Sequence, residues 1–262
     1  MSLHDAYARV TPYELAFRDR ARADELVQAV EGEAKGRGGA LADEPEAFLM
    51  MASVEAFVRA LEGPDAPTGA MFHYGALVYQ GFHFTRAGCP LFLLGTHAAR
   101  FLVEGAPDGE PKAPAPAGYL QLPRHLFWTT GDDDTPESVD GVFWTLTTDG
   151  VLRALLAMGI RPDRAGLGVV QLPEAPIDEA HAWMGVDARG DGSDFSSSMP
   201  GGDIDTLYAF RTAGEVLKLL ARFFAYAASV PLALQAGMAP DASDRDGPQP
   251  SSLPFTRVSL HP

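Results

Sequence analysis

Hydrophobic positions in the first 62 residues recur at the three- and four-residue spacing of amphipathic helices. Thr11, Pro12 and Glu14 stand in the order of an N-cap, a first helical residue and the glutamate of a capping box. This spacing of apolar residues is more regular in the second half of the region. A Gly-Pro pair follows the second half and is a typical signal for the end of a helix. The N-terminal part is therefore predicted to form a pair of helices, at 12–34 and 45–62.

Aromatic residues and glycines dominate the next segment, and this composition favours strands. Two strands are predicted, at 77–84 and 90–94, and a short helix is expected after Thr96. The segment 105–118 is rich in proline and is not expected to form regular structure. It is interpreted as a surface loop within one domain, with a domain boundary as the alternative.

Two similar Phe-Trp segments predict a β-hairpin. They begin at Arg124 and Gly141, and the polar loop 131–140 between them carries five acidic residues. This loop is interpreted as a solvated tip, with contact to a cation or a basic partner as the alternative. The aromatic residues of both segments are expected in the core: Phe127, Trp128, Phe143 and Trp144.

The segment 148–159 favours a helix, because Thr148 or Asp149 can cap it and its apolar residues fall on one helical face. The segment 166–173 then favours a strand. Strand, helix and strand over roughly 33 residues have the length of a βαβ unit. An antiparallel return is the alternative.

The longest helix is predicted at 204–229, and apolar residues cover most of its circumference, which is typical of a buried central helix. The tail 237–262 has the composition of a mostly disordered segment, although its last ten residues are apolar enough to dock as an edge. The predicted fold class is α+β, with a mixed or antiparallel sheet of aromatic strands. A single domain is expected over 1–236.

The charge balance limits the partners that the chain is expected to meet. Its net charge is −15, from 35 acidic and 20 basic residues, and it has no basic run. Nucleic acids and anionic membranes are therefore not expected partners, whereas the negative electrostatic field of the chain is compatible with a basic protein partner. A high content of Ala, Gly, Pro, Arg and Asp resembles GC-rich coding, which fits a bacterial source.

Several features favour the cytoplasm. No apolar signal-peptide region is visible at the N-terminus. The most apolar stretch, 216–234, is interrupted by charges and falls short of the roughly 20 apolar residues of a membrane span. Cys89 is the single cysteine, so no internal disulfide can form, and its apolar surroundings predict a buried thiol.

The stretch VDARGDGSDF at 186–195 is the most motif-like part of the sequence. When an EF-hand calcium-binding loop is aligned from Asp187, Arg189 and Ser198 stand at two positions that require carboxylates. It is therefore interpreted as a solvated turn. In the alternative, the loop 187–202 is a flap over a binding pocket, and Asp187, Asp191 and Asp194 contact the ligand.

Histidines and tyrosines supply the other candidate site. His83 and His97 are candidate catalytic residues, and His73, Tyr74 and Tyr79 are candidate ligand-binding residues. The histidines have no metal-binding spacing, and neither a metal nor a cofactor is predicted.

Motifs of common hydrolases, nucleotide-binding proteins and dinucleotide-binding proteins are absent from the sequence. The leading hypothesis is an acidic, non-enzymatic accessory or binding protein with a protein partner, for example one that neutralises a basic protein. The alternative is an enzyme or small-molecule-binding protein with a His/Tyr-lined pocket that the 187–202 loop closes. A homo-oligomer is compatible with the sequence.

Overall fold

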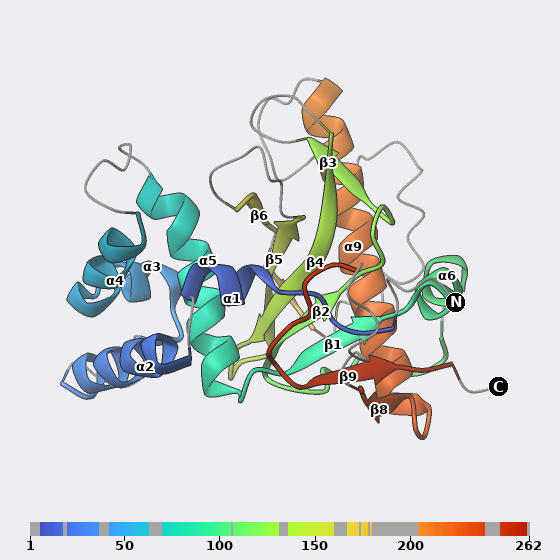
Figure 1. The fold of residues 1–262 in the computed structure, drawn as a ribbon, viewed down its shortest axis with the longest axis horizontal. Coiled ribbons are helices and arrows are strands. Elements are labelled where there is room, and N and C mark those ends of the chain that lie inside the picture. Colours follow the sequence, from blue (N-terminus) through green and yellow to red (C-terminus); the bar gives the residue numbers. More distant parts are fainter. Residues whose placement is uncertain are drawn as a thin grey trace.

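A mixed β-sheet with helices on both faces forms the centre of the molecule (Figure 1). The computed structural model describes residues 6–17, 20–36, 42–62, 70–105, 107–130, 136–159, 167–172, 174–177, 179, 204–238 and 247–260. The helices are α1 (Pro12–Phe17), α2 (Arg20–Lys35), α3 (Pro45–Leu49), α4 (Ala52–Glu62), α5 (Ala70–Arg86), α6 (Thr96–Glu104) and α9 (Ile204–Ser229). The strands are β1 (Leu91–Leu94), β2 (Ala117–Gln121), β3 (Trp128–Thr130), β4 (Pro136–Leu146), β5 (Val151–Met158), β6 (Val169–Gln171), β7 (Ala175–Pro176), β8 (Leu234–Ala236) and β9 (Phe255–Val258).

The sheet has the strand order β6-β5-β4-β2-β1-β9-β8, with β3 paired to β4 and β7 paired to β5. Strand β1 is parallel to both of its neighbours, β2 and β9, and the other pairings are antiparallel. The predicted α+β class is confirmed, and the sheet is mixed.

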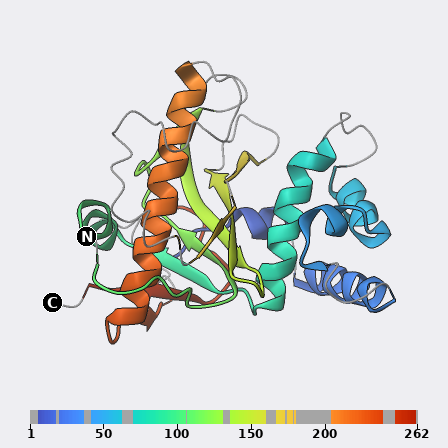
Figure 2. The same cartoon turned by 180° about the vertical axis from the view of Figure 1, so that it is seen from behind.

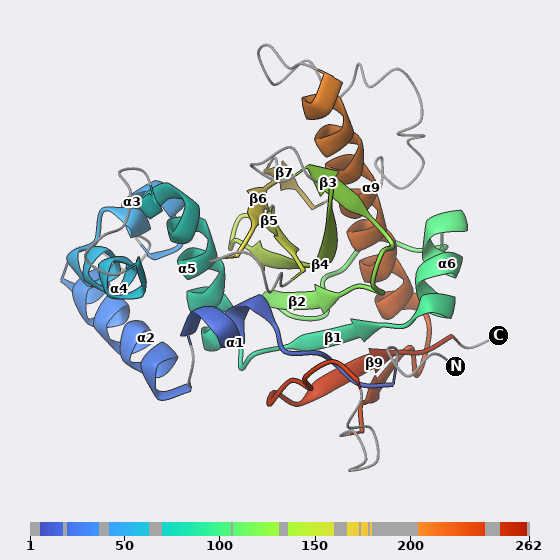
Figure 3. The same cartoon turned by 45° about the horizontal axis from the view of Figure 1, so that its top comes forward.

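Alternate residues of the central strands face two different cores. In β4, Val142 and Trp144 pack with α9, whereas Phe143 between them packs with α5. Figure 2 shows α9 lying across one face of the sheet. In Figure 3, α5 lies between the sheet and the helices α2, α3 and α4. Helix α5 therefore separates the sheet from α2, α3 and α4.

The predicted capping box is confirmed at the start of α1. The Thr11 amide donates to a Glu14 carboxylate oxygen at 2.8 Å, and the Glu14 amide donates to the Thr11 hydroxyl at 3.2 Å. The two predicted N-terminal helices are each divided, into α1 and α2 and into α3 and α4. Their extents otherwise follow the prediction.

The strand predicted at 77–84 is wrong, because these residues lie inside α5. Two glycines explain how so aromatic a helix packs. A Cβ atom at Gly75 would lie 2.5 Å from the Leu49 side chain, and one at Gly81 would lie 2.4 Å from the ring of Phe17. Both contacts join residues that are far apart in the sequence. The strand propensity of single residues takes no account of such contacts. The strand predicted at 90–94 and the short helix after it are confirmed as β1 and α6.

The helix predicted at 148–159 is also wrong, because this segment is strand β5, which returns antiparallel to β4. The predicted βαβ unit is therefore wrong for this segment, the alternative of an antiparallel return is confirmed, and the following strand is confirmed as β6. Leu152 and Leu156 face the α9 core, whereas Leu155 and Ala157 face the α5 core. A strand that is buried on both faces has no polar alternation, so its sequence resembles that of a buried helix.

A hairpin of β3 and β4 is present, because Trp128–Thr130 pair antiparallel with residues 136–138. The second Phe-Trp segment, however, pairs with β2 and β5 and not with the first, so the predicted pairing of the two segments is wrong. Phe143 and Trp144 are buried and Phe127 is partly buried, but Trp128 is 47% exposed, so its predicted place in the core is wrong. Two acids assigned to the loop, Glu137 and Asp140, lie in β4 instead.

The long helix at 204–229 is confirmed as α9, and its described side chains from Val216 to Tyr226 are buried. The prediction of a mostly disordered tail is wrong for residues 247–260, whereas the expected docking of the last ten residues is confirmed for Phe255–Val258. Strand β9 lies between β1 and β8, inside the sheet and not at its edge. Average composition misses a four-residue strand that is stabilised only by pairing with distant segments.

The proline-rich segment 105–118 connects two parts of one sheet, since β1 before it pairs with β2 at its end. The Trp144 indole donates to the backbone oxygen of Ala115 at 3.1 Å. The number of domains stays a prediction.

Candidate functional site

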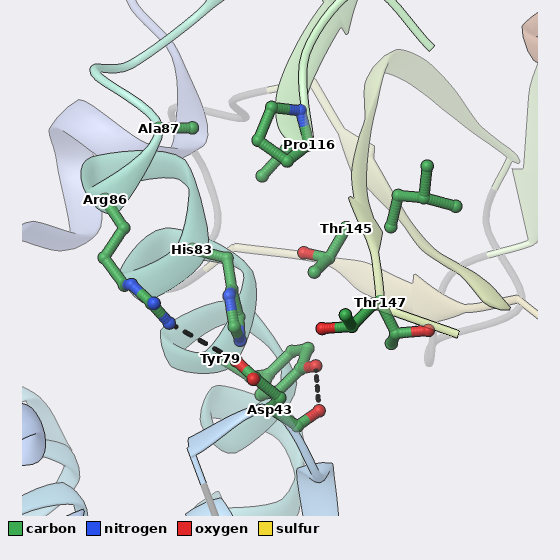
Figure 4. A pocket seen from close by; sticks show the side chains of 11 residues that line it. Asp43, Tyr79, His83, Arg86, Ala87, Pro116, Thr145 and Thr147 are labelled. Carbon is green, nitrogen blue, oxygen red and sulfur yellow. Dashed lines mark hydrogen bonds and ion pairs between the residues drawn. The ribbon is translucent and has the colours of Figure 1, made fainter. Parts of the chain in front are cut away.

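A cavity of about 270 Å³ lies between α5 and the side of the sheet where β2 begins and β4 ends (Figure 4). It is lined by Asp43, Tyr79, His83, Arg86, Ala87, Pro116, Ala117, Thr145, Leu146, Thr147 and Thr148. Tyr79 and His83 are four residues apart in α5 and therefore occupy one face of the helix. The cavity thus contains two of the candidate residues that the sequence suggested.

His83 is a buried, neutral side chain. Its Nε2 lies 3.2 Å from the backbone oxygen of Ala42. Because a carbonyl can only accept, Nε2 carries the proton and Nδ1 is an acceptor. Burial lowers the pKa of His83 to about 4, and the charge of Arg86 acts in the same direction. At neutral pH the ring is therefore uncharged.

Tyr79 is held in place by its hydroxyl. This group donates to the backbone oxygen of Asp43 at 2.8 Å and accepts from the Arg153 guanidinium at 3.2 Å. Its ring lies 4.5 Å from the ring of His83, centroid to centroid. Burial raises the pKa of Tyr79 to about 12, although Arg153 acts in the opposite direction. The phenol therefore keeps its proton at physiological pH.

Arg86 and Asp43 form the charged part of the cavity wall. A guanidinium nitrogen of Arg86 lies 3.3 Å from a carboxylate oxygen of Asp43, and another lies 3.6 Å from Glu31. All three side chains are partly exposed, at about two fifths of their surface. This ion pair is therefore accessible to water and to a ligand.

Arg153 joins the sheet to the segment before α3, and it was not among the site residues predicted from the sequence. It donates to the Asp43 backbone oxygen at 2.7 Å and to Glu174 at 2.9 Å, and it lies 3.4 Å from Glu44. It also lines a second cavity of about 170 Å³ on the other side of Tyr79. A single arginine in the apolar run VLRALLAM was the available signal.

Two other candidate residues, His97 and Tyr74, are not among the described residues that line this cavity. His97 is exposed on α6. Tyr74 is partly buried on α5 beside the N-terminal core. His73 also lies in α5, but its side chain is outside the described part of the chain, as are Asp187, Asp191 and Asp194.

The polar side chains that line the cavity are Asp43, Tyr79, His83, Arg86 and three threonines. None of its described lining residues is a serine or a cysteine, and Cys89 is buried elsewhere, as predicted. The described residues contain no cluster of three His, Cys, Asp or Glu side chains that could hold a metal ion. No described helix is long and apolar enough to cross a membrane.

Comparisons with known proteins give one distant likeness to report. No family model and no curated protein matches the chain. A solved structure described as "Crystal structure of AcrVA2" is similar to 94% of this chain and to 81% of its own chain, with 11% sequence identity and a TM-score of 0.42. Neither value is high enough for this likeness to bear on the function.

Proposed function

We propose that this chain is a non-enzymatic binding protein, and that the cavity beside α5 receives a cationic side chain of a protein partner. The observation that carries the proposal is the set of hydrogen-bond acceptors in the cavity. His83 presents an unprotonated Nδ1, which has no partner among the described residues, and Asp43 presents a carboxylate. An arginine or lysine side chain supplies donors to both.

The size of the cavity also favours a side chain. Pockets for small molecules and cofactors occupy roughly 300–1,000 Å³. The cavity, at about 270 Å³, lies just below this range. One long side chain fits such a volume.

The pKa values of the cavity residues favour binding over catalysis. A general base works best with a pKa near the working pH. His83, with a pKa of about 4, is too weak a base for this role at neutral pH. Tyr79 is held in its protonated form, with a pKa of about 12.

Charge on this face adds to the attraction for a cation. Around the cavity, the four carboxylates of Glu31, Asp43, Glu44 and Glu174 are paired with only two guanidinium groups, those of Arg86 and Arg153. The whole chain carries −15. Association with a basic partner is therefore expected to be fast and to slow at high salt.

Nuclear magnetic resonance of the ¹⁵N-labelled full chain tests this proposal with N-acetyl-arginine amide as the probe. The matched neutral ligand is N-acetyl-citrulline amide, which has the same shape without the charge. We expect the arginine compound to shift the amide signals of Ala87, Thr147 and Thr148, and the citrulline compound to bind about tenfold more weakly, as expected for a charge-assisted contact.

Asp43→Asn is expected to abolish the preference for arginine, whereas Asp108→Asn, the same change on the exposed proline-rich segment, should preserve it. Equal binding of the two ligands, or an Asp43→Asn variant that keeps the preference, would refute the proposal. Tight binding or turnover of a neutral small molecule in this cavity would favour the enzyme or small-molecule alternative.

A further inference from the structure

A third cavity, of about 370 Å³, lies at the opposite end of β4. Its walls come from the N-terminal segment at Arg9, the turn at Arg124 and His125, the β4 residues Ser138 to Asp140, and the C-terminal segment at 248–249. Asp140 lies five residue steps along β4 from Thr145, which lines the first cavity. At roughly 3.4 Å per residue, the two cavities lie about 17 Å apart along the strand.

Arg9 is the buried cation of this third cavity. Its side chain is 4% exposed. Its Nε and Nη2 atoms donate to Asp140 at 3.3 and 2.8 Å, and Nη2 also donates to the Leu122 backbone oxygen at 2.8 Å. Its third nitrogen, Nη1, has no partner among the described residues. A guanidinium that is fixed on one side and open on the other can bind an anion without first being ordered.

Asp140 is fully engaged in holding Arg9. Its second carboxylate oxygen accepts from the Tyr119 hydroxyl at 2.7 Å and from the Gln121 side chain at 3.1 Å. Gln121 in turn accepts from the Arg9 amide and donates to the Arg9 backbone oxygen. This network fixes the position of Arg9 in the cavity wall.

The turn at Arg124 and His125 adds a second cation. The Leu126 amide donates to the Pro123 backbone oxygen at 3.3 Å, and His125 has a φ of 64° in this turn. That conformation normally favours glycine and costs about 1–3 kcal/mol for other residues. The Ser138 hydroxyl accepts from the His125 amide, and the imidazole stacks on Trp128 at 5.1 Å. The unfavourable turn therefore places an imidazole and an exposed guanidinium on the same cavity wall.

We propose that this third cavity binds a small organic monocarboxylate, whose carboxylate lies between Arg9 Nη1 and the Arg124 guanidinium. Two arginines and one aspartate leave a single positive charge locally, which one carboxylate neutralises. The net charge of −15 opposes multiply charged anions and so favours a monoanion. The volume leaves room for a ring or a chain beside the carboxylate.

Titration of the full ¹⁵N-labelled chain with benzoate tests the site, and benzamide is the matched neutral ligand. We expect benzoate to shift the Nε–H signal of Arg9 and to bind about tenfold more tightly than benzamide, a difference of ~1.4 kcal/mol. Arg124→Gln should remove most of this preference. Arg100→Gln, an equal loss of charge at an exposed position on α6, should leave it within about twofold.

The proposal fails if benzamide binds as tightly as benzoate, if the Arg9 signal does not move, or if Arg124→Gln binds benzoate like Arg100→Gln. Arg9 itself is not substituted, because removing one partner of a buried ion pair destabilises the fold. Arg124 is exposed, so its variant is expected to fold and its result can be interpreted.

Discussion

His83 is expected to make the folded state sensitive to acid. In the unfolded chain its pKa is about 6.5. In the folded chain burial lowers it to about 4. Between these values the unfolded chain binds more protons than the folded chain, so the free energy of unfolding rises with pH across this range and falls as the pH is lowered.

The magnitude follows from the two pKa values and from the 8% exposure of the side chain, which leaves little solvent screening. Lowering the pH from 7 to 5 should reduce the free energy of unfolding by about 2 kcal/mol through this one residue. Urea unfolding, followed by circular dichroism at both pH values, measures the change. His83→Gln is the informative variant, because a glutamine amide can donate to Ala42 but does not titrate.

We expect the wild-type chain to lose about 2 kcal/mol more than His83→Gln between pH 7 and pH 5. The control His97→Gln removes an exposed histidine and should lose stability like the wild type. The reasoning is refuted if His83→Gln loses as much stability as the wild type over this interval. It is also refuted if His97→Gln gives the same protection.

Three further predictions concern the fold. A Cβ atom at Gly141 would lie 2.5 Å from a backbone oxygen of β2, so Gly141→Ala should lower the free energy of unfolding, measured with urea, by about 3 kcal/mol. Gly32 lies in open space on α2, so Gly32→Ala should raise the free energy of unfolding. Glu14 accepts from two serines of the C-terminal segment, so Glu14→Gln should cost about 1–3 kcal/mol and speed protease cleavage within 247–254; unchanged cleavage would contradict this. The Cys89 thiol is buried and its pKa is raised by burial, so an aromatic disulfide reagent should modify it only at urea concentrations that unfold the chain.

Local signals in the sequence were sufficient for several elements. The capping box at Thr11 and Glu14, the hairpin of β3 and β4, and the extent of α9 all depend on residues close together in the chain. The backbone and capping hydrogen bonds that define these elements lie within a turn, a strand pair or one helix. For this reason the residue pattern alone predicts them.

Elements in the interior were assigned wrongly for a common physical reason. Strand β5 is covered on both faces, which removes the alternation that marks a strand. Helix α5 contains aromatic residues and two glycines whose use becomes clear only when Leu49 and Phe17 lie against them. In both cases burial by distant segments, and not local propensity, decides the secondary structure.

The sequence by itself determined the α+β class, the acidic charge and the inclusion of Tyr79 and His83 among the candidate residues. The tertiary structure decided their surroundings. It brought Asp43 and Arg153 to Tyr79 across 36 and 74 residues of chain, and it placed Arg9 beside Asp140 across 131 residues. The acid–base properties of a side chain depend on its burial and on the charges beside it, and in these sites both are supplied by residues that are remote in sequence.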